Sequence, residues 1–157
     1  MSVLLKRAST PSKPNLAKGK LDTSGAWPLQ RRDLMQRSEA VLFHRFSEAL
    51  PDHVILAQVA MQSFLKVRQG ERQAQAWQWK FDKKYVDFVI CDQNFAIIAV
   101  VELDGASHRD EKQAERDRDK SRALSAAGIR LVRLEPERLP SGQAIRELLG
   151  ITVTNLS

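Results

Sequence analysis

The chain has 157 residues, one cysteine and a formal net charge of +6. It contains no apolar run long enough to span a bilayer, and its single cysteine cannot form an internal disulfide, which excludes a membrane-spanning helix and a disulfide-stabilised scaffold. The length allows one domain with a real core, and the apolar run near the start is too short for a secretory signal, so we expect a cytoplasmic protein without membrane association.

The excess positive charge lies in the first 32 residues. Seven Lys or Arg and one acid, Asp22, lie there, whereas residues 33–157 contain 18 basic and 18 acidic residues. This first segment is rich in Lys, Ser, Pro and Gly and has no sustained periodicity. We therefore predict a basic, disordered tail over residues 1–32 and a folded domain over residues 33–157. The tail could bind phosphates nonspecifically, or it could be a solvated leader.

The first predicted element of the domain is a helix that ends near Leu50. Asp33 and Gln36 have the spacing of an N-cap and its capping-box partner, and apolar residues follow at helical spacing. Glu39 falls on the apolar stripe, so it lies either at the edge of the core or in a site. A strand over residues 53–61 follows.

The stretch from residue 62 to residue 79 has no clear period. We expect a loop or irregular excursion that leads into a strand from Phe81 to Cys91. Trp77 and Trp79 lie at the end of this stretch. We expect them to pack against the sheet, with stacking on nucleic-acid bases as the alternative.

Residues 85–108 contain two strongly apolar strands joined by a tight turn. A turn centred on Gln93 and Asn94 would place Asp87 opposite Val100 on the partner strand, two residues from Glu102. Diagonal neighbours of this kind share a face, with Cα atoms roughly 7 to 8 Å apart.

Two carboxylates in such an apolar place need a cation or several donors. Asp87 and Glu102 are close enough in the predicted register to reach one divalent ion, and Asp104 lies on the same face. A register shift of one residue would place the first two on opposite faces. The interpretation therefore depends on the turn.

A polar helix is predicted over residues 109–127, capped by Ser107 with Asp110 and ended by Gly128. Its helical period aligns one stripe of residues. Because the apolar member of that stripe must face the core, the acid and the lysine lean toward the sheet. The stripe consists of Gln113, Asp117, Lys120 and Leu124.

A strand over residues 129–134 and a helix over residues 141–149 complete the prediction. The order is helix, three strands, helix, strand, helix. It predicts an α/β (α+β mixed) fold in which a central mixed four-stranded sheet is flanked by helices.

The acid pair forms a minimal oxygen-ligand site for Mg²⁺ or Mn²⁺. These hard cations take one or two protein carboxylates and retain waters, which leaves positions for a phosphate and a nucleophilic water. No Cys or His cluster has zinc spacing, and no Walker loop, dinucleotide glycine pattern or nucleophile elbow is present.

The motifs VDF, ELDGASH, RDRDK and GIRLVRL, in this order, resemble the PD-(D/E)XK restriction-endonuclease-like superfamily. The resemblance covers about residues 33–135 and is closest to small bacterial domains of unknown function that resemble very-short-patch repair endonucleases. It implies a restriction-endonuclease-like core and a metal-dependent nuclease that hydrolyses phosphodiester bonds in DNA, in repair, defence or mobile-element processing. RNA as the substrate is not excluded.

The resemblance also implies roles for individual residues. Asp87 and Glu102 match the metal-binding acids, with the Leu103 carbonyl as a further ligand, and Glu39 matches an acid that relatives place beside the metal. Asp104 stands where the superfamily often has a catalytic lysine, which an aspartate cannot replace. Lys120 on the following helix is the candidate substitute. His108 and Arg116 could bind phosphate, or His108 could assist proton transfer.

Each role has a structural alternative. A lysine, Lys84 or Lys120, could pair with the acids and leave no place for a metal. Asp104 could be solvated or cap the following turn, and His108 could make only local hydrogen bonds at the helix start. The alternative function is therefore an inactive nuclease-fold module that binds nucleic acid or a protein partner.

Overall fold

The computed structural model describes residues 23–104 and 111–151, and its backbone divides into two units, Met1–Arg32 and Asp33–Ser157. Residues 23–32 of the first unit form no helix or strand. The prediction of a disordered tail falls mainly on residues outside the described part of the chain.

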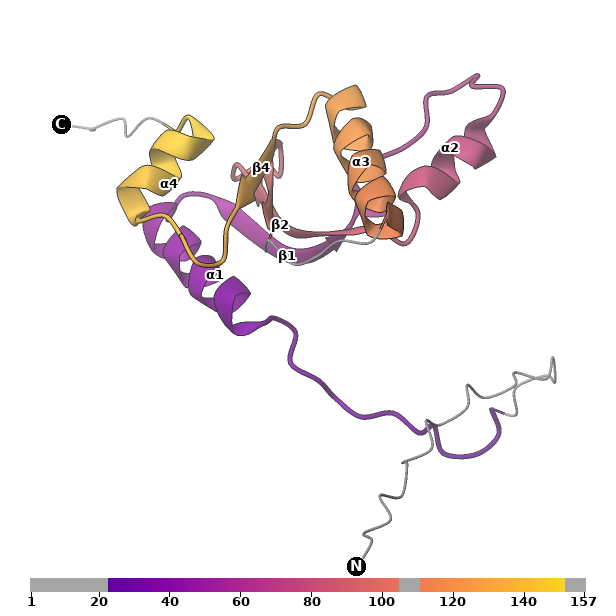
Figure 1. Ribbon diagram of the computed structural model, residues 1–157, viewed down its shortest axis with the longest axis horizontal. Coiled ribbons are helices and arrows are strands. Elements are labelled where there is room, and N and C mark those ends of the chain that lie inside the picture. The colour runs from indigo at the N-terminus through magenta and orange to yellow at the C-terminus, as the bar shows by residue number, and fades with distance from the viewer. Residues whose placement is uncertain (1–22, 105–110, 152–157) are drawn as a thin grey trace, which may run out of the picture. The chain divides into compact units, whose positions relative to one another are not determined.

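The second unit contains the predicted helices and strands in the predicted order, with a short 3-10 helix and one α-helix added between the first two strands. In chain order they are α1 (Arg37–Ala49), β1 (Val54–Ala60), the 3-10 helix η1 (Met61–Ser63), α2 (Ala74–Phe81), β2 (Tyr85–Cys91), β3 (Ile97–Leu103), α3 (Glu111–Ala126), β4 (Leu131–Leu134) and α4 (Gly142–Leu149) (Figure 1).

The four strands form one mixed sheet in the order β1-β2-β3-β4. The first three strands are antiparallel neighbours, and β4 runs parallel to β3. A parallel return needs a crossover, and α3 provides it between β3 and β4. The predicted mixed α/β architecture, a four-stranded sheet flanked by helices, is confirmed.

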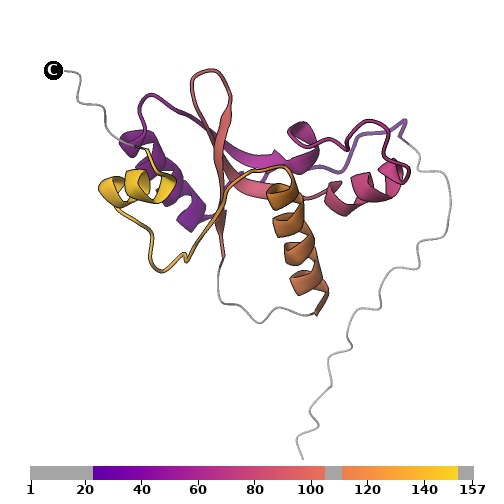
Figure 2. The same ribbon diagram turned by 90° about the horizontal axis from the view of Figure 1, so that it is seen from above.

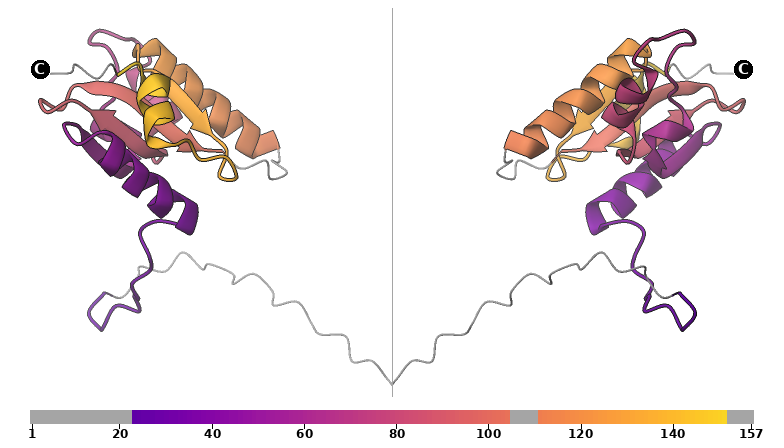
Figure 3. Two further views of the ribbon diagram at one scale, coloured as in Figure 1. Left: turned by 90° about the vertical axis from the view of Figure 1, so that its left-hand side faces the viewer. Right: turned by 90° about the vertical axis from the view of Figure 1, so that its right-hand side faces the viewer.

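Helices cover both faces of the sheet (Figure 2). Helices α1 and α4 pack on one face, where Leu42 and Phe46, one helical turn apart, contact buried strand residues. Helix α3 packs on the other face through Leu124, and Figure 3 shows the sheet between α1 and α3. Burial on both faces explains why β2 and β3 are nearly continuous in apolar residues.

The start of α1 differs from the prediction. The N-cap is Gln36, not Asp33, and the backbone N–H of Gln36 donates to Glu39 Oε2 over 2.6 Å. A glutamate at the third helical position satisfies an orphan N–H and its charge complements the helix dipole, so it is a better box partner than a glutamine. The sequence contained this box three residues further on.

Helix α2 replaces part of the predicted loop, and β2 begins at Tyr85 rather than at Phe81. The helix was missed because it buries one side chain, Phe81, and so has no apolar stripe. Trp77 and Trp79 are 54% and 69% exposed, so the prediction that they pack against the sheet is wrong.

The ends of α3 and α4 were predicted correctly. Gly128 and Gly150 have φ angles of 71° and 68°, in the left-handed region that glycine adopts at a helix C-terminus. The predicted cap at Ser107 lies outside the described residues. Within the described residues, no helix has the length and apolar character needed to cross a membrane.

Candidate functional site

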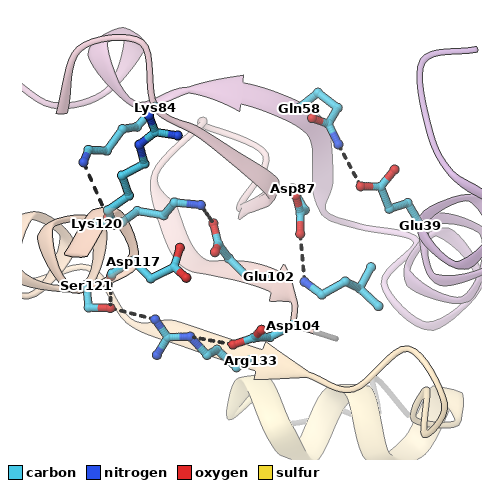
Figure 4. Close-up of polar contacts among 12 residues, drawn as sticks. Glu39, Gln58, Lys84, Asp87, Glu102, Asp104, Asp117, Lys120, Ser121 and Arg133 are labelled. Carbon is cyan, nitrogen blue, oxygen red and sulfur yellow. Dashed lines mark hydrogen bonds and ion pairs between the residues drawn. The ribbon is translucent and has the colours of Figure 1, made fainter. Parts of the chain in front are cut away.

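The two predicted acids lie on neighbouring strands, β2 and β3, within a strongly apolar surround. Glu102 is 9% exposed. Phe88, which follows Asp87, and Val101, which precedes Glu102, are fully buried. The backbone of β2 and β3 fixes both positions. Figure 4 shows both side chains in the close-up, with Glu39 and Lys120 among the residues drawn around them.

The predicted register of these strands is wrong by two residues, although the turn is centred as predicted. Phe95 N–H donates to the Asp92 carbonyl over 3.1 Å, but Phe95 then adopts a φ of 63° and adds one residue to the loop. A second extra residue, Ile98, lies at an irregularity where Cys91 pairs with Ile97 and Ile90 pairs with Ala99. Left-handed residues and bulges of this kind are common in hairpins.

The shift keeps both acids on one face, because two extra residues restore the alternation of side chains. The printed pairing ends at Phe88 and Val101, and the same register continued by one residue would place Asp87 opposite Glu102 rather than diagonal to it. Directly opposed side chains have Cβ atoms about 4.5 to 5.5 Å apart, and like charges there are destabilising. The charge of Asp87 raises the pKa of Glu102, as expected for two carboxylates in proximity.

Asp87 is held by the backbone of the neighbouring strand. Its Oδ2 accepts a hydrogen bond from the Leu103 N–H over 2.8 Å. Burial nevertheless raises the pKa of Asp87 above its ordinary value, the Leu103 bond and the Lys120 charge lower it, and the charge of Glu39 raises it further. The fold thus holds a carboxyl group where ionisation is unfavourable.

Glu102 is paired with Lys120 from α3. The Lys120 Nζ donates to Glu102 Oε1 over 2.6 Å, with both side chains largely buried. Burial still raises the pKa of Glu102, against the lowering effect of Lys120 and with a further increase from Asp87. The prediction that the stripe with Leu124 turns Lys120 toward the sheet is confirmed.

Glu39 on α1 is connected to this region by Gln58, a residue that was not among the predicted site residues. Gln58 on β1 donates from Nε2 to Glu39 Oε1 over 3.0 Å (Figure 4). Gln58 has a φ of 52° in the middle of β1, and the ladder between β1 and β2 is interrupted where it faces Asp87. A left-handed glutamine within a strand is strained. The sequence carries no signal for it, because glutamine does not mark such a position.

Asp104 follows β3 and lies in a different set of contacts. Its Oδ2 is 3.6 Å from Arg133 Nε on β4, and Arg133 also donates to Ser121 Oγ over 2.7 Å. Arg133 was not among the predicted site residues, but its place opposite Glu102 in the parallel β3–β4 pair is the signal that could have identified it.

The remaining predicted residues lie away from the acid pair or outside the described chain. Lys84 pairs with Asp119 at 3.7 Å rather than with either acid, and it donates to the Arg116 carbonyl over 3.5 Å. Arg116 itself is exposed. His108 lies outside the described residues.

The donor set fits a small divalent cation. Both acids supply oxygen, each uses one named oxygen in the bonds above, and their pKa values are raised by burial, as expected for carboxylates whose charge a cation would offset. No three His, Cys, Asp or Glu side chains gather into a metal-binding group within residues 23–104 and 111–151. Mg²⁺ needs only one or two protein carboxylates, so a pair is sufficient.

Comparison with known proteins gives a family and a relative. The chain is 30% identical over 125 residues to an uncharacterised protein of Haemophilus influenzae, a match that covers 77% of this chain and 62% of that protein. The chain therefore spans somewhat less than two thirds of that relative. No solved structure matches. Residues 31–151, which contain every element described above, match the family called "Protein of unknown function (DUF2726)", and the chain belongs to this family.

Proposed function

We propose that this protein is a metal-dependent nuclease that hydrolyses phosphodiester bonds in DNA. The observation that carries the proposal is a pair of carboxylates on adjacent strands, the buried Glu102 and the partly buried Asp87, with Lys120 donating to Glu102 over 2.6 Å. Burying two acids side by side is costly, so such a pair is more typical of a site than of a core.

The order of these residues supports membership of the PD-(D/E)XK restriction-endonuclease-like superfamily. An acid on the first helix, one on each of two hairpin strands and a lysine on the crossover helix follow the pattern to which the sequence is similar. The mixed sheet with helices on both faces is compatible with that fold.

In this proposal Asp87, Glu102 and the Leu103 carbonyl would hold Mg²⁺ or Mn²⁺. The cation, when bound, polarises the phosphoryl group and lowers the pKa of the attacking water. The Lys120 ammonium orients Glu102 and offsets negative charge that develops on the phosphate. Glu39, held by Gln58, adds negative potential beside Asp87 and favours a cation there.

Asp104 has no direct catalytic part in this proposal. Where the superfamily often has a lysine, Asp104 pairs with Arg133 and so holds an arginine at the edge of the site. Lys120 supplies the ammonium group instead. The role of Asp104 is to position Arg133.

A second candidate function is supported by the closed ion pair between Lys120 and Glu102. Lys120 is paired with Glu102, and Asp104 stands where the superfamily often has a lysine. In this second function the same fold binds nucleic acid or a protein partner without cleaving it. Binding without turnover would be the result that favours this second candidate.

Cleavage assays with isosteric variants test the proposal. Purified protein is incubated with supercoiled plasmid, single-stranded DNA and RNA, in Mg²⁺, Mn²⁺ or EDTA. We expect divalent-dependent cleavage, which Asp87→Asn lowers by more than the roughly 10- to 100-fold that loss of an outer-shell partner costs. Lys120→Met should also lower it, with partial recovery in Lys120→Arg.

The matched control is Asp52→Asn, which makes the same chemical change at an exposed position after α1 and should cleave like the wild type. A divalent ion that binds the folded state should also raise the Tm of the wild type but not of Asp87→Asn. The nuclease proposal would be wrong if no substrate is cleaved, or if Asp87→Asn cleaves as well as Asp52→Asn.

A further inference from the structure

Residues 61–84, which leave the sheet after β1 and return at β2, carry an unusual combination of side chains. We call them the Trp segment. They contain six basic residues and two acidic ones, a net charge of +4, although residues 33–157 as a whole are neutral. They also carry Trp77 and Trp79, both more than half exposed, on α2.

The Trp segment is attached firmly beside the acid pair. Its two ends meet where Met61 N–H donates to the Lys84 carbonyl over 2.9 Å, and Met61, Leu65 and Phe81 anchor it in the core. Lys80 and Lys84 both reach the Asp119 carboxylate, at 3.4 and 3.7 Å. Asp119 directly precedes Lys120 on α3, so the segment is fixed to the helix that carries the site lysine.

The exposed tryptophans do not form a protein-like apolar patch. Residues two apart on an α-helix point about 200° away from each other, so Trp77 and Trp79 project to different sides of α2. Their direct neighbours in the helix sequence are Ala76, Gln78 and Lys80. An apolar protein surface would bind a contiguous apolar patch. Separate aromatic side chains among basic ones favour nucleic acid instead, because bases stack on the aromatic rings and phosphates contact the basic groups.

A third exposed aromatic residue lies closer to the acids. Tyr85 is 55% exposed and precedes Asp87 by two residues on β2. A base stacked on Tyr85 would lie two residues along β2 from Asp87. Base faces are available to aromatic side chains only where the bases are unpaired.

We propose that the Trp segment binds unpaired nucleic acid, with bases stacked on Trp77, Trp79 and Tyr85 and phosphates on the surrounding Lys and Arg. Where the proposed nuclease function also holds, the segment directs single-stranded regions to Asp87 and Glu102, so the substrate is single-stranded or contains unpaired bases. Bases can be supplied by DNA or by RNA.

Binding is measured in EDTA, so that it does not depend on cleavage. Fluorescence anisotropy of labelled oligo-dT and oligo-rU, each about 20 nucleotides long to exceed the usual site size, is compared with a duplex of equal length. We expect tighter binding of the single strands than of the duplex, with quenching of tryptophan fluorescence. Comparison of the two single strands separates DNA from RNA as the source of the bases.

Variants identify the surface. Trp79→Ala should weaken single-strand binding about five- to a hundredfold, the cost of losing one stacked base, while Trp79→Phe should retain much of it. The matched control is Trp27→Ala, because Trp27 is 66% exposed and Trp79 is 69% exposed. Both sites are on the surface, so thermal melting should show equal folding of all three variants.

The inference is overturned if Trp79→Ala binds single strands like the wild type, if Trp27→Ala weakens binding as much, or if duplex is preferred. Loss of self-association in Trp79→Ala with unchanged oligonucleotide affinity would equally overturn it and assign α2 to a protein contact. Divalent-dependent cleavage that persists in Trp79→Ala with unchanged affinity sinks this inference alone. Trp-dependent binding without cleavage sinks the nuclease function alone.

Discussion

The two acids of the site, Asp87 and Glu102, lower the free energy of unfolding when they are ionised. Asp87 and Glu102 lie on the neighbouring strands β2 and β3, and burial raises the pKa of both. A carboxyl group whose pKa is higher in the folded state than in the unfolded state favours folding when it is protonated. This contribution is fully present below the unfolded pKa and is lost as the pH rises through the folded pKa.

Asp87→Asn should therefore raise the free energy of unfolding at pH 7. The amide oxygen can still accept the Leu103 N–H, while the cost of a buried charge disappears. Below the ordinary pKa of 3.8, Asp87 is protonated in both states and the difference should vanish. Each tenfold preference of the folded state for the protonated acid is worth about 1.4 kcal/mol. Urea denaturation of both proteins at several pH values measures it.

The control for this experiment is again Asp52→Asn, at an exposed position. Its difference from the wild type should stay small at every pH, because an exposed acid is little affected by folding. A variant Asp87→Asn that is less stable than the wild type at pH 7 would contradict the argument, because it would mean that the charge of Asp87 stabilises the fold.

At the scale of one element, β1 is shaped by a single left-handed residue. Gln58 has a φ of 52°, which interrupts the ladder opposite Asp87, and its side chain reaches Glu39 on α1. Regular pairing of β1 with β2 is thus absent at Gln58, whose side chain instead connects α1 with the region of the acids. Strain of this kind is found mostly at functional sites.

Comparison of Gln58→Gly with Gln58→Ala isolates the backbone strain, because both variants lose the bond to Glu39. In an ordinary strand, glycine is less stable than alanine by about 0.5 to 1 kcal/mol. At Gln58 we expect the reverse order, with glycine more stable by about 1 kcal/mol, because alanine is disfavoured at positive φ. Urea denaturation gives both free energies.

The neighbouring position Ala57, which pairs regularly with Phe88, supplies the control. Ala57→Gly should destabilise the protein in the ordinary direction. If Gln58→Gly is also less stable than Gln58→Ala, then the left-handed backbone at Gln58 is not a property of the protein in solution.

Sequence reasoning succeeded for elements whose pattern depends on burial. Leu124 fixed the orientation of α3 and so placed Lys120 at the acids, and the apolar strands showed where carboxylates would be buried. It failed where the backbone departs from regular geometry. The extra residues Phe95 and Ile98 moved the strand register by two, and neither has a side chain that marks a bulge.

Helix α2 shows the second limit. Its tryptophans were expected to pack against the sheet, yet Trp79 is 69% exposed. A helix that buries a single side chain, as α2 buries Phe81, leaves no apolar period for the sequence to display. The exposure of these tryptophans on α2 is the feature from which nucleic-acid binding is inferred.

For the whole molecule, charge is divided unevenly between the two units. Residues 1–32 carry the entire net charge of +6, and residues 33–157 carry none. Each basic residue that neutralises a phosphate releases counterions. The slope of log affinity against log salt concentration is therefore about −0.9 per contact for duplex DNA and about −0.7 for single strands. The first unit can therefore add nonspecific affinity, whereas discrimination of single strands belongs to the Trp segment.

Deletion of residues 1–32 should separate these contributions. We expect weaker binding of both duplex and single strands at low salt and a salt slope that is smaller by at most about 6, since seven basic residues are removed. The ratio of single-strand to duplex affinity should be unchanged or larger. Anisotropy titrations of the full chain and residues 33–157 at several salt concentrations measure both quantities. If deletion abolishes the preference for single strands, that preference arises in the first 32 residues, not on α2.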